Sequence, residues 1–325
     1  MKRFMLALLA LVLCAGTASA QNDANWPTKP IRFVVPFPAG SFADIAMRIM
    51  QQKLGARLGQ QLVIDNRSGA SGNIGADMLA KSPPDGYNFG VATNSTHGVS
   101  PALNPSMPYD PVKDFAMVSL IGDAPYVLIT TPDLPARSVE ELIALAKSKP
   151  GALNYASAGP ASLAHLAGAL FEQMAGVKLT EVPYRSSSQS ILDTTEGRIE
   201  MQFGTMGPVL PHIRAGKVKA LAVTGLKRLD ILPDVPTLDE SGLKGYDAVL
   251  WLAVVAPAGT PPAIVARMNR ELKEVLAEPD VVELFKAQGV NAASSTPDEL
   301  RALIERDIDK WRKLAKETGI TMEAK

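Results

Sequence analysis

The fold follows from one stretch of sequence, Ile31-Arg-Phe-Val-Val-Pro-Phe-Pro-Ala-Gly-Ser-Phe-Ala-Asp44. Its first five residues are apolar or β-branched apart from one arginine, which predicts a short buried strand. Pro36 and Pro38 remove backbone donors and end that strand. Ser41 and Asp44, three positions apart, form a capping-box pattern, so a helix is expected to begin there. Strand, loop and helix in this order predict a βα unit.

The predicted helix continues to a stop at Gly59. Its apolar positions approximate one face, formed by Phe42, Ile45, Ile49 and Leu58. Gly40 lets the backbone come close to a ligand. The first amide groups of a helix lack internal partners and the helix dipole is positive there, so this loop suits a carboxylate or a phosphate. An ordinary βα connection without a ligand is the alternative.

The first 20 residues are typical of a secretory signal peptide. Lys2 and Arg3 form a basic start, and residues 4–13 form an apolar segment too short to span a bilayer. Ala18-Ser-Ala20 is an A-x-A cleavage site, so we expect cleavage after Ala20 and export of the mature chain.

Cys14 is the only cysteine and lies in this leader. Lipidation there is not expected, because Leu13 is larger than the small residue that normally precedes a lipidated cysteine. Removing 20 of the 325 residues leaves 305 without a cysteine. Disulfides, thiol nucleophiles and cysteine metal sites are therefore excluded from the mature chain.

The charge and the length of the chain restrict its expected partners and its number of domains. The chain has 33 Lys and Arg against 33 Asp and Glu, so loss of the leader's two basic residues gives a net charge of −2 without a long like-charged block. Neither nucleic acid nor an anionic membrane is an expected partner. A chain of this length exceeds a usual single core, so two domains are expected.

Short apolar runs alternate with helical patterns along the chain, which predicts an α/β fold with mainly parallel sheets. The expected strands after the first are 62–65, 87–92, 154–156, 180–184, 199–203 and 218–223. Helices are expected to open at Ser138, at Ser162, at Thr260-Pro261 and at Thr296. The last helix carries one apolar face that would dock on a core, made up of Leu300, Leu303, Ile304, Ile308, Trp311 and Leu314.

Two apolar runs, 118–130 and 248–256, are longer than the others. One interpretation makes them paired crossings between two domains. Domain 1 is then discontinuous, residues 26–122 plus 250–325, and domain 2 comprises residues 123–249. The alternative is that both runs are central strands of one sheet.

Further loops rich in glycine and hydroxyl groups follow predicted strands. Residues 66–75 contain three glycines free to adopt positive φ, spaced G-x-x-G-x-x-G, which is neither a Walker A loop nor G-x-G-x-x-G. Thr93-Asn-Ser-Thr-His97 and Ser157-Ala-Gly-Pro-Ala-Ser162 end two other strands. Ligands of open α/β sheets bind beyond the carboxyl ends of strands, so these loops are expected to converge.

A series of motifs runs along the mature chain, at residues 26–32, 36–40, 66–67 with 72–76, 84–87, 109–115, 153–157, 165–168, 182–184, 211–216, 232–237 and 256–261. In these motifs and in their order the chain resembles the Bug family of periplasmic receptors of tripartite tricarboxylate transporters. The resemblance implies a two-domain, type II periplasmic binding protein fold that closes on a small carboxylate, and it favours the crossing interpretation. It also implies a periplasmic location and delivery to a two-component membrane permease, and we expect a monomer.

In such receptors the loops equivalent to 36–41 and 159–162 face each other and hold a ligand carboxylate. The ligand-binding residues that the resemblance implies here are Phe37, Gly40, Ser41, Thr93, Ser95, Gly159, Ser162 and His165. Fixed N–H and O–H donors at helix starts would satisfy a carboxylate without a counter-charge.

This chain departs from the family pattern within the expected cleft. Ser41 replaces a second glycine, Arg185-Ser186 replaces Lys-Gly, and Gly204-Thr205 replaces Asp-Asn. Without that aspartate a ligand ammonium loses a partner, whereas Arg185, if it faces inward, offers a fork for a second carboxylate. We therefore expect an unaminated mono- or dicarboxylate, with Arg185 and Thr205 in the site. A solvated loop arginine is the alternative for Arg185.

The rival class is an exported hydrolase or other enzyme. His97, His165 and His212 show no metal-binding spacing, and Ser71 lacks the last glycine of G-x-S-x-G. A triad on another pattern remains open, because its members need not be close in sequence. We expect no enzyme activity, no metal and no cofactor. A receptor that presents its liganded form to a membrane sensor kinase is a further alternative that the sequence does not separate from a permease receptor.

Overall fold

The computed structural model describes residues 25–159, 162–184 and 187–321. The predicted signal peptide, residues 1–20, and Arg185 lie outside the described residues. Within the described ranges, no helix is long and apolar enough to cross a membrane.

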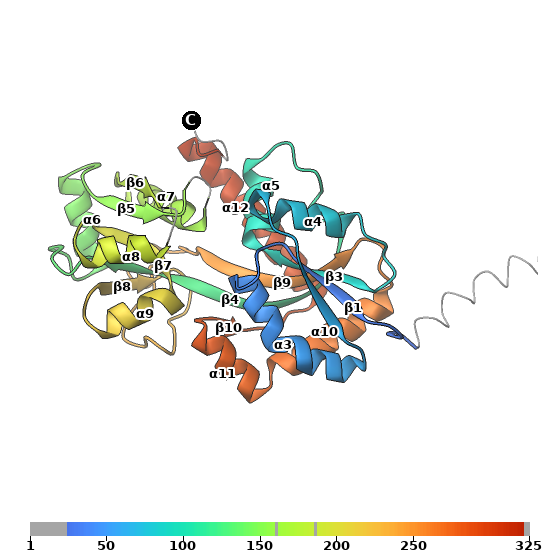
Figure 1. The fold of residues 1–325 in the computed structure, drawn as a ribbon. Coiled ribbons are helices and arrows are strands. Elements are labelled where there is room, and N and C mark those ends of the chain that lie inside the picture. The colour runs from blue at the N-terminus through green and yellow to red at the C-terminus, as the bar shows by residue number, and fades with distance from the viewer. Residues whose placement is uncertain (1–24, 160–161, 185–186, 322–325) are drawn as a thin grey trace, which may run out of the picture.

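In this part of the chain, ten strands form one continuous sheet, which Figure 1 shows as a ribbon. Along the sheet the order is β2-β1-β3-β9-β4-β7-β5-β6, and β8 and β10 both pair with β4. The strands are β1 (Ile31–Val35), β2 (Leu62–Asn66), β3 (Asn88–Thr93), β4 (Phe115–Thr130), β5 (Asn154–Ser157), β6 (Thr180–Pro183), β7 (Met201–Thr205), β8 (Lys219–Val223), β9 (Val249–Pro257) and β10 (Asn291–Ala292).

Helices cover both faces of this sheet. The helices are α3 (Phe42–Leu58), η1 (Ala70–Gly72), α4 (Asn73–Ala80), η2 (Ser95–Val99), α5 (Ser100–Leu103), α6 (Val139–Ser148), α7 (Leu163–Ala175), α8 (Ser187–Thr195), α9 (Met206–Arg214), α10 (Pro262–Leu276), α11 (Pro279–Ala287) and α12 (Pro297–Thr318). The strands and helix starts that the sequence predicts are present, and the ends of the short strands differ by at most two residues.

The first βα unit is confirmed in detail. β1 spans Ile31–Val35 as expected, Ser41 is the N-cap of α3, and Gly59 ends the helix with φ 72. Of the apolar positions predicted to share one face of α3, Leu58 is buried, whereas Phe42, Ile45 and Ile49 are only half-buried. The buried side chains of α3 are Ala43, Asp44, Ala46, Met47, Met50, Leu54 and Leu58. The side of α3 that packs on the core is formed largely by alanine and methionine, because alanine allows close packing and methionine fills gaps.

The two long apolar runs form β4 and β9, which lie at the centre of the sheet and connect its two halves. The first part of β4, up to Pro125, pairs with β9, and its last part, from Tyr126, pairs with β7 and β8. Figure 1 shows β5 to β8 on one side of these two strands and β1 and β3 on the other, and β2 follows β1 at the edge of the sheet. The chain therefore passes twice between the halves.

The C-terminal helix packs on both halves. Leu300, Ile304 and Ile308 join a core cluster that includes Trp251 of β9. Trp311 and Leu314 join the core of the second half, which also contains Phe171 of α7. The apolar face predicted for this helix is confirmed, with Leu303 only partly buried.

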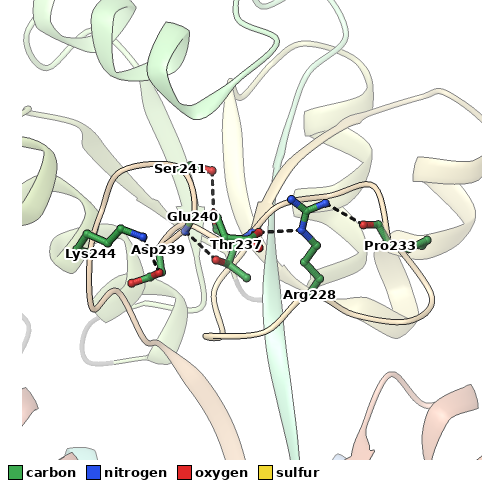
Figure 2. A network of polar contacts seen from close by, with 7 residues as sticks. All are labelled: Arg228, Pro233, Thr237, Asp239, Glu240, Ser241 and Lys244. Carbon is green, nitrogen blue, oxygen red and sulfur yellow. Dashed lines mark hydrogen bonds and ion pairs between the residues drawn. The ribbon is translucent and has the colours of Figure 1, made fainter.

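The connection from β8 to β9 is held by a polar network (Figure 2). Thr237 Oγ1 accepts from the Glu240 amide at 2.9 Å, and the Glu240 carboxylate accepts from the Thr237 amide at 2.9 Å. Arg228 Nε donates to Glu240 at 2.8 Å, and Lys244 pairs with Asp239 at 3.0 Å. These contacts fix the path by which the chain returns to the second crossing.

Candidate functional site

The carboxyl ends of the parallel strands in the two halves point toward each other. β3 runs antiparallel to β9 and ends with Thr93 opposite Leu252, which is in turn opposite Gly122 of β4. β7 runs in the opposite direction along β4 and ends with Thr205 opposite Tyr126. Gly122 and Tyr126 are four positions apart, which is about 13 Å along a strand at about 3.3 Å per residue. The loops after β1, β2 and β3 therefore face the loops after β5, β6 and β7.

The first of these loops leads into α3. Ser41 Oγ accepts from the Asp44 amide at 3.3 Å, and the Ser41 amide donates to Pro38 O at 3.1 Å. The next two amides, of Phe42 and Ala43, have no hydrogen-bond partner among the described residues. The helix start thus offers two amides and the hydroxyl proton of Ser41 as donors.

Gly40 contributes a turn and not a free amide. It has φ 79, a conformation that favours glycine. Its N–H donates at 2.8 Å to Oδ2 of Asp44. The expectation that Gly40 lies in this loop is confirmed, but its amide is already used by the protein.

Asp44 is a buried carboxylate, 1 % exposed, that holds this loop from inside. Besides Gly40, it accepts from Arg48 Nε at 2.8 Å and from Asn66 Nδ2 at 3.1 Å. Burial works to raise the pKa of Asp44, but the hydrogen bonds from Arg48, Gly40 and Asn66 outweigh it and hold the pKa below its usual value. The carboxylate is therefore ionised and fully paired, a role that the capping-box pattern only partly indicated.

The loops after β2 and β3 pack against the loop that carries Phe37. Ser95 Oγ donates to Ser71 O at 3.0 Å, and a Cβ on Gly72 would lie 2.7 Å from Thr96 and 3.1 Å from the Phe37 ring. Four consecutive residues have positive φ: Gly69 (130), Ala70 (48), Ser71 (57) and Gly72 (94). Positive φ at two non-glycine residues is strained, and such strain is concentrated at functional loops.

One expectation for this segment was wrong. Gly75 does not adopt positive φ but lies within α4. A Cβ there would approach the Arg67 carbonyl oxygen at 2.6 Å and Pro36 Cα at 2.8 Å. Glycine is required at this position because the helix packs directly on the backbone after β1.

Thr93 is part of a buried local network. Its amide donates to Thr96 Oγ1 at 3.1 Å, and it is 4 % exposed. Thr96 Oγ1 lies 2.9 Å from Nδ1 of His97, whose ring packs 4.6 Å from that of Phe115. Burial lowers the pKa of His97 to about 3, so this histidine is neutral and belongs to the core.

The second helix start, at α7, repeats the arrangement of the first. Ser162 is the N-cap, and its Oγ accepts from the His165 amide at 3.2 Å. The amides of Leu163 and Ala164 have no hydrogen-bond partner in the described ranges. Gly159, with φ 97, has its amide bonded to Ser157 Oγ at 2.8 Å, so this glycine too shapes the turn without offering a free amide.

His165 lies behind this turn, next to a glutamate that the sequence did not single out. Its Nε2 is 3.6 Å from Oε2 of Glu181 on β6, and Glu181 also accepts from Ser157 Oγ. Burial lowers the pKa of His165, and the charges of Glu181 and Glu172 oppose this effect. His165 also lines a pocket of about 630 Å³, together with Glu172 of α7 and Glu317 of α12.

Thr205 ends β7 and is the N-cap of α9, but its side chain makes no capping hydrogen bond. It pairs with Tyr126, whose pKa is raised to about 12 by burial of the phenol. Thr205 thus lies at the end of its strand that faces the first half, at the crossing. Among the described residues, no group of three or more His, Cys, Asp or Glu is placed to hold a metal ion.

Solved structures of the same architecture establish the fold as that of a two-domain periplasmic binding protein. The periplasmic binding protein BugD is 32% identical, with a TM-score of 0.74 over 91% of this chain and 99% of that chain. An R. palustris protein solved with adipate is 37% identical, with a TM-score of 0.77 over 91% and 99% of the two chains. MatC from Rhodopseudomonas palustris with bound malate is 30% identical, with a TM-score of 0.72 over 89% and 99%. The two-domain periplasmic binding protein fold expected from the sequence is confirmed. The sheet is mixed and not mainly parallel as expected, because the long strands β4 and β9 pair antiparallel with each other and with β3, β7, β8 and β10.

The family follows from the sequence comparisons. Residues 46–320 match the model of the tripartite tricarboxylate transporter family receptor. Protein BugT of Bordetella pertussis is 37% identical over 324 residues, which cover 99% of each chain. The chain belongs to the tripartite tricarboxylate transporter receptor family, the Bug receptors, as its motifs indicated. It is a solute receptor of this family of periplasmic proteins.

Proposed function

We propose that this receptor binds a small carboxylate between its two halves and delivers it to a two-component membrane permease. The observation that carries the proposal is the pair of helix starts. Each has a serine N-cap, Ser41 or Ser162, followed by two amides without partners in the described ranges. They follow β1 and β5, whose carboxyl ends face each other across the crossing.

The N–H and O–H donors of the two helix starts suit the acceptor sites of a carboxylate. A carboxylate has about four acceptor sites, and each helix start offers two N–H groups and one O–H group. Neither residues 36–43 nor residues 157–165 contain a lysine or an arginine. Neutral donors and two helix dipoles would hold an anion without a permanent ion pair, so release to a permease stays possible.

The ligand class that we propose is an unaminated mono- or dicarboxylate. Gly204 and Thr205 place no carboxylate at the end of β7, and Asp44 and Glu181 already have partners. A ligand ammonium would therefore lack an anionic partner at these positions. The relatives solved with adipate and with malate support this class. Arg185 stays in the proposed site as the group for a second carboxylate.

The domain division that we propose is residues 26–122 plus 250–325 for domain 1 and residues 123–249 for domain 2. The strand pairings support it, since β4 pairs with β9 up to Pro125 and with β7 and β8 beyond that residue. α12 packs on both halves and would follow their movement. A ligand that contacts both helix starts would shift an open-closed equilibrium toward closure. Cleavage after Ala20 would release the monomeric receptor into the periplasm.

The test is a thermal-shift screen of the mature protein, refolded to remove bound ligand, against mono-, di- and tricarboxylates, amino acids, amines and sugars. A ligand at about 100 times its Kd should stabilise the fold by about 2.7 kcal/mol. A shift with one class of carboxylates supports the proposal. A shift only with amines or sugars would refute it.

A further inference from the structure

A carboxylate outside the ligand-facing loops holds the start of α7. Glu181 is the second residue of β6 and lies opposite Tyr155 in the β5–β6 register. One of its oxygens accepts from Ser157 Oγ at the end of β5. The other lies 3.6 Å from His165 Nε2 in the first turn of α7. One side chain, 23% exposed, thus contacts both the strand before the loop and the helix after it.

The contact extends through the loop as a chain of hydrogen bonds. Ser157 Oγ donates to Glu181 and accepts from the Gly159 amide at 2.8 Å. The Gly159 carbonyl in turn accepts from the Ser162 amide at 3.1 Å. Because a hydroxyl has one proton, its donation to Glu181 turns the Ser157 lone pairs toward Gly159. The position of the N-cap Ser162 is therefore linked to Glu181.

In the first half, a carboxylate contacts the corresponding glycine amide without an intervening hydroxyl. There the amide of Gly40, also at positive φ, donates to Asp44. In both halves an internal carboxylate fixes the amide of a left-handed glycine before the N-cap serine. What is left for a ligand is the serine hydroxyl and the next two amides, held in place before the ligand arrives. Fixing donors in advance lowers the entropy lost on binding.

The structure assigns Glu181 the role of a positioning residue for carboxylate binding at the start of α7, acting through Ser157 and Gly159. This assignment rests on the function proposed above. Glu181 need not touch the ligand, since its oxygens face Ser157 and His165. This chain of hydrogen bonds from Glu181 to Ser162 is called the relay below. It requires only an acceptor for the Ser157 proton, so an isosteric amide at position 181 should fulfil the same function as the carboxylate.

The test uses the variants Glu181→Ala, Glu181→Gln and Ser157→Ala in the mature protein. Glu140→Ala is the matched control, because Glu140 is an exposed glutamate of α6 without a hydrogen bond or ion pair to the described residues. The Kd values for adipate and for malate are measured by calorimetry. Exchange of the Gly159 amide is measured by NMR in the ligand-free protein.

We expect Glu181→Ala and Ser157→Ala each to raise the Kd about tenfold and to speed exchange of the Gly159 amide. The variant that combines Glu181→Ala with Ser157→Ala should bind no more weakly than either single variant, as expected for two members of one relay. Glu181→Gln and Glu140→Ala should keep both properties within about twofold of the parent. A variant that only lowered the overall stability would leave the Kd of the folded protein unchanged.

Unchanged binding and exchange in Glu181→Ala would overturn the assignment, as would a Glu181→Gln variant as impaired as Glu181→Ala. If the parent protein bound neither adipate nor malate, the proposed function would lose its support. Exchange at Gly159 still decides the relay in that case. Faster exchange in Glu181→Ala with rescue by Glu181→Gln supports it, and unchanged exchange refutes it.

Discussion

The amide of Gly40 donates a 2.8 Å hydrogen bond to the carboxylate of Asp44. The anion that binds this amide at the start of α3 is therefore a side chain of the protein itself. The protein supplies its own anion to the turn and leaves the next two amides unpartnered among the described residues. The loop is therefore shaped before a ligand binds.

Replacing Asp44 by Ala should lower the free energy of unfolding by about 1–2 kcal/mol, because the part-buried donors from Gly40 and Asn66 lose their acceptor. Asp44→Asn keeps the shape and one acceptor oxygen, so its loss should be smaller. Urea denaturation at pH 7 measures both. Equal stability of the alanine variant and the parent would show that the interior carboxylate does not hold the loop.

Asp44 also predicts an acid dependence. Its pKa is lower in the folded protein than the usual value, so its stabilisation is present above about pH 4 and is lost as the pH falls through the folded-state pKa. The stability of Asp44→Asn should therefore fall less steeply than that of the parent between pH 5 and pH 3. Parallel curves from urea denaturation across this range would contradict the pairing.

His97 predicts a second pH effect at milder acidity. Its folded-state pKa is lowered to about 3 by burial, so the unfolded chain takes up a proton below about pH 6.5 and the folded protein does not. Stability should fall by about 2 kcal/mol from pH 8 to pH 5 on this account. A His97→Gln variant should lack this dependence. The same pH slope in variant and parent would assign it to other groups.

The N-cap serines should separate binding from folding. Ser41→Ala and Ser162→Ala should each weaken carboxylate binding about tenfold while lowering stability by only about 1 kcal/mol. Ser138→Ala is the control, since Ser138 caps α6 in the same way, with its Oγ 3.2 Å from the Glu141 amide. It should show the same loss of stability with unchanged affinity. Affinity that is unchanged in Ser162→Ala would remove Ser162 from the site.

Closure should be visible at Trp251. Its Nε1 donates to Asp307 of α12 at 3.0 Å, at the crossing between the halves. Binding of a carboxylate should change its fluorescence, and Trp251→Phe should abolish the change. Trp26→Phe serves as a control, because Trp26 lies before β1 and donates to Gly86 O. A signal that persists without Trp251 would place the movement elsewhere.

Local patterns predicted the elements well and the packing less well. Residues adjacent in sequence determine β1, the caps at Ser41 and Gly59 and the helix start at Thr296, and the structure has them all. The buried face of α3 and the reason for Gly75 depend on how closely a helix approaches another backbone, which a single sequence does not encode locally.

The site shows the same division. The sequence indicated the two helix starts, because cap residues and glycines are local signals. Glu181 was missed because its role depends on the pairing of β6 with β5, which brings it to Ser157, 24 residues earlier. Its place in a strand between two polar loops was the available signal.

Binding of one carboxylate between the two helix starts can be tested by NMR of the ¹⁵N-labelled mature protein during titration with the carboxylate that gives the largest thermal shift. We expect large chemical-shift changes and slowed exchange at the amides of Phe42, Ala43, Leu163 and Ala164 together, because one ligand would bridge both helix starts. Saturating carboxylate binding that leaves these four amides unchanged would contradict it.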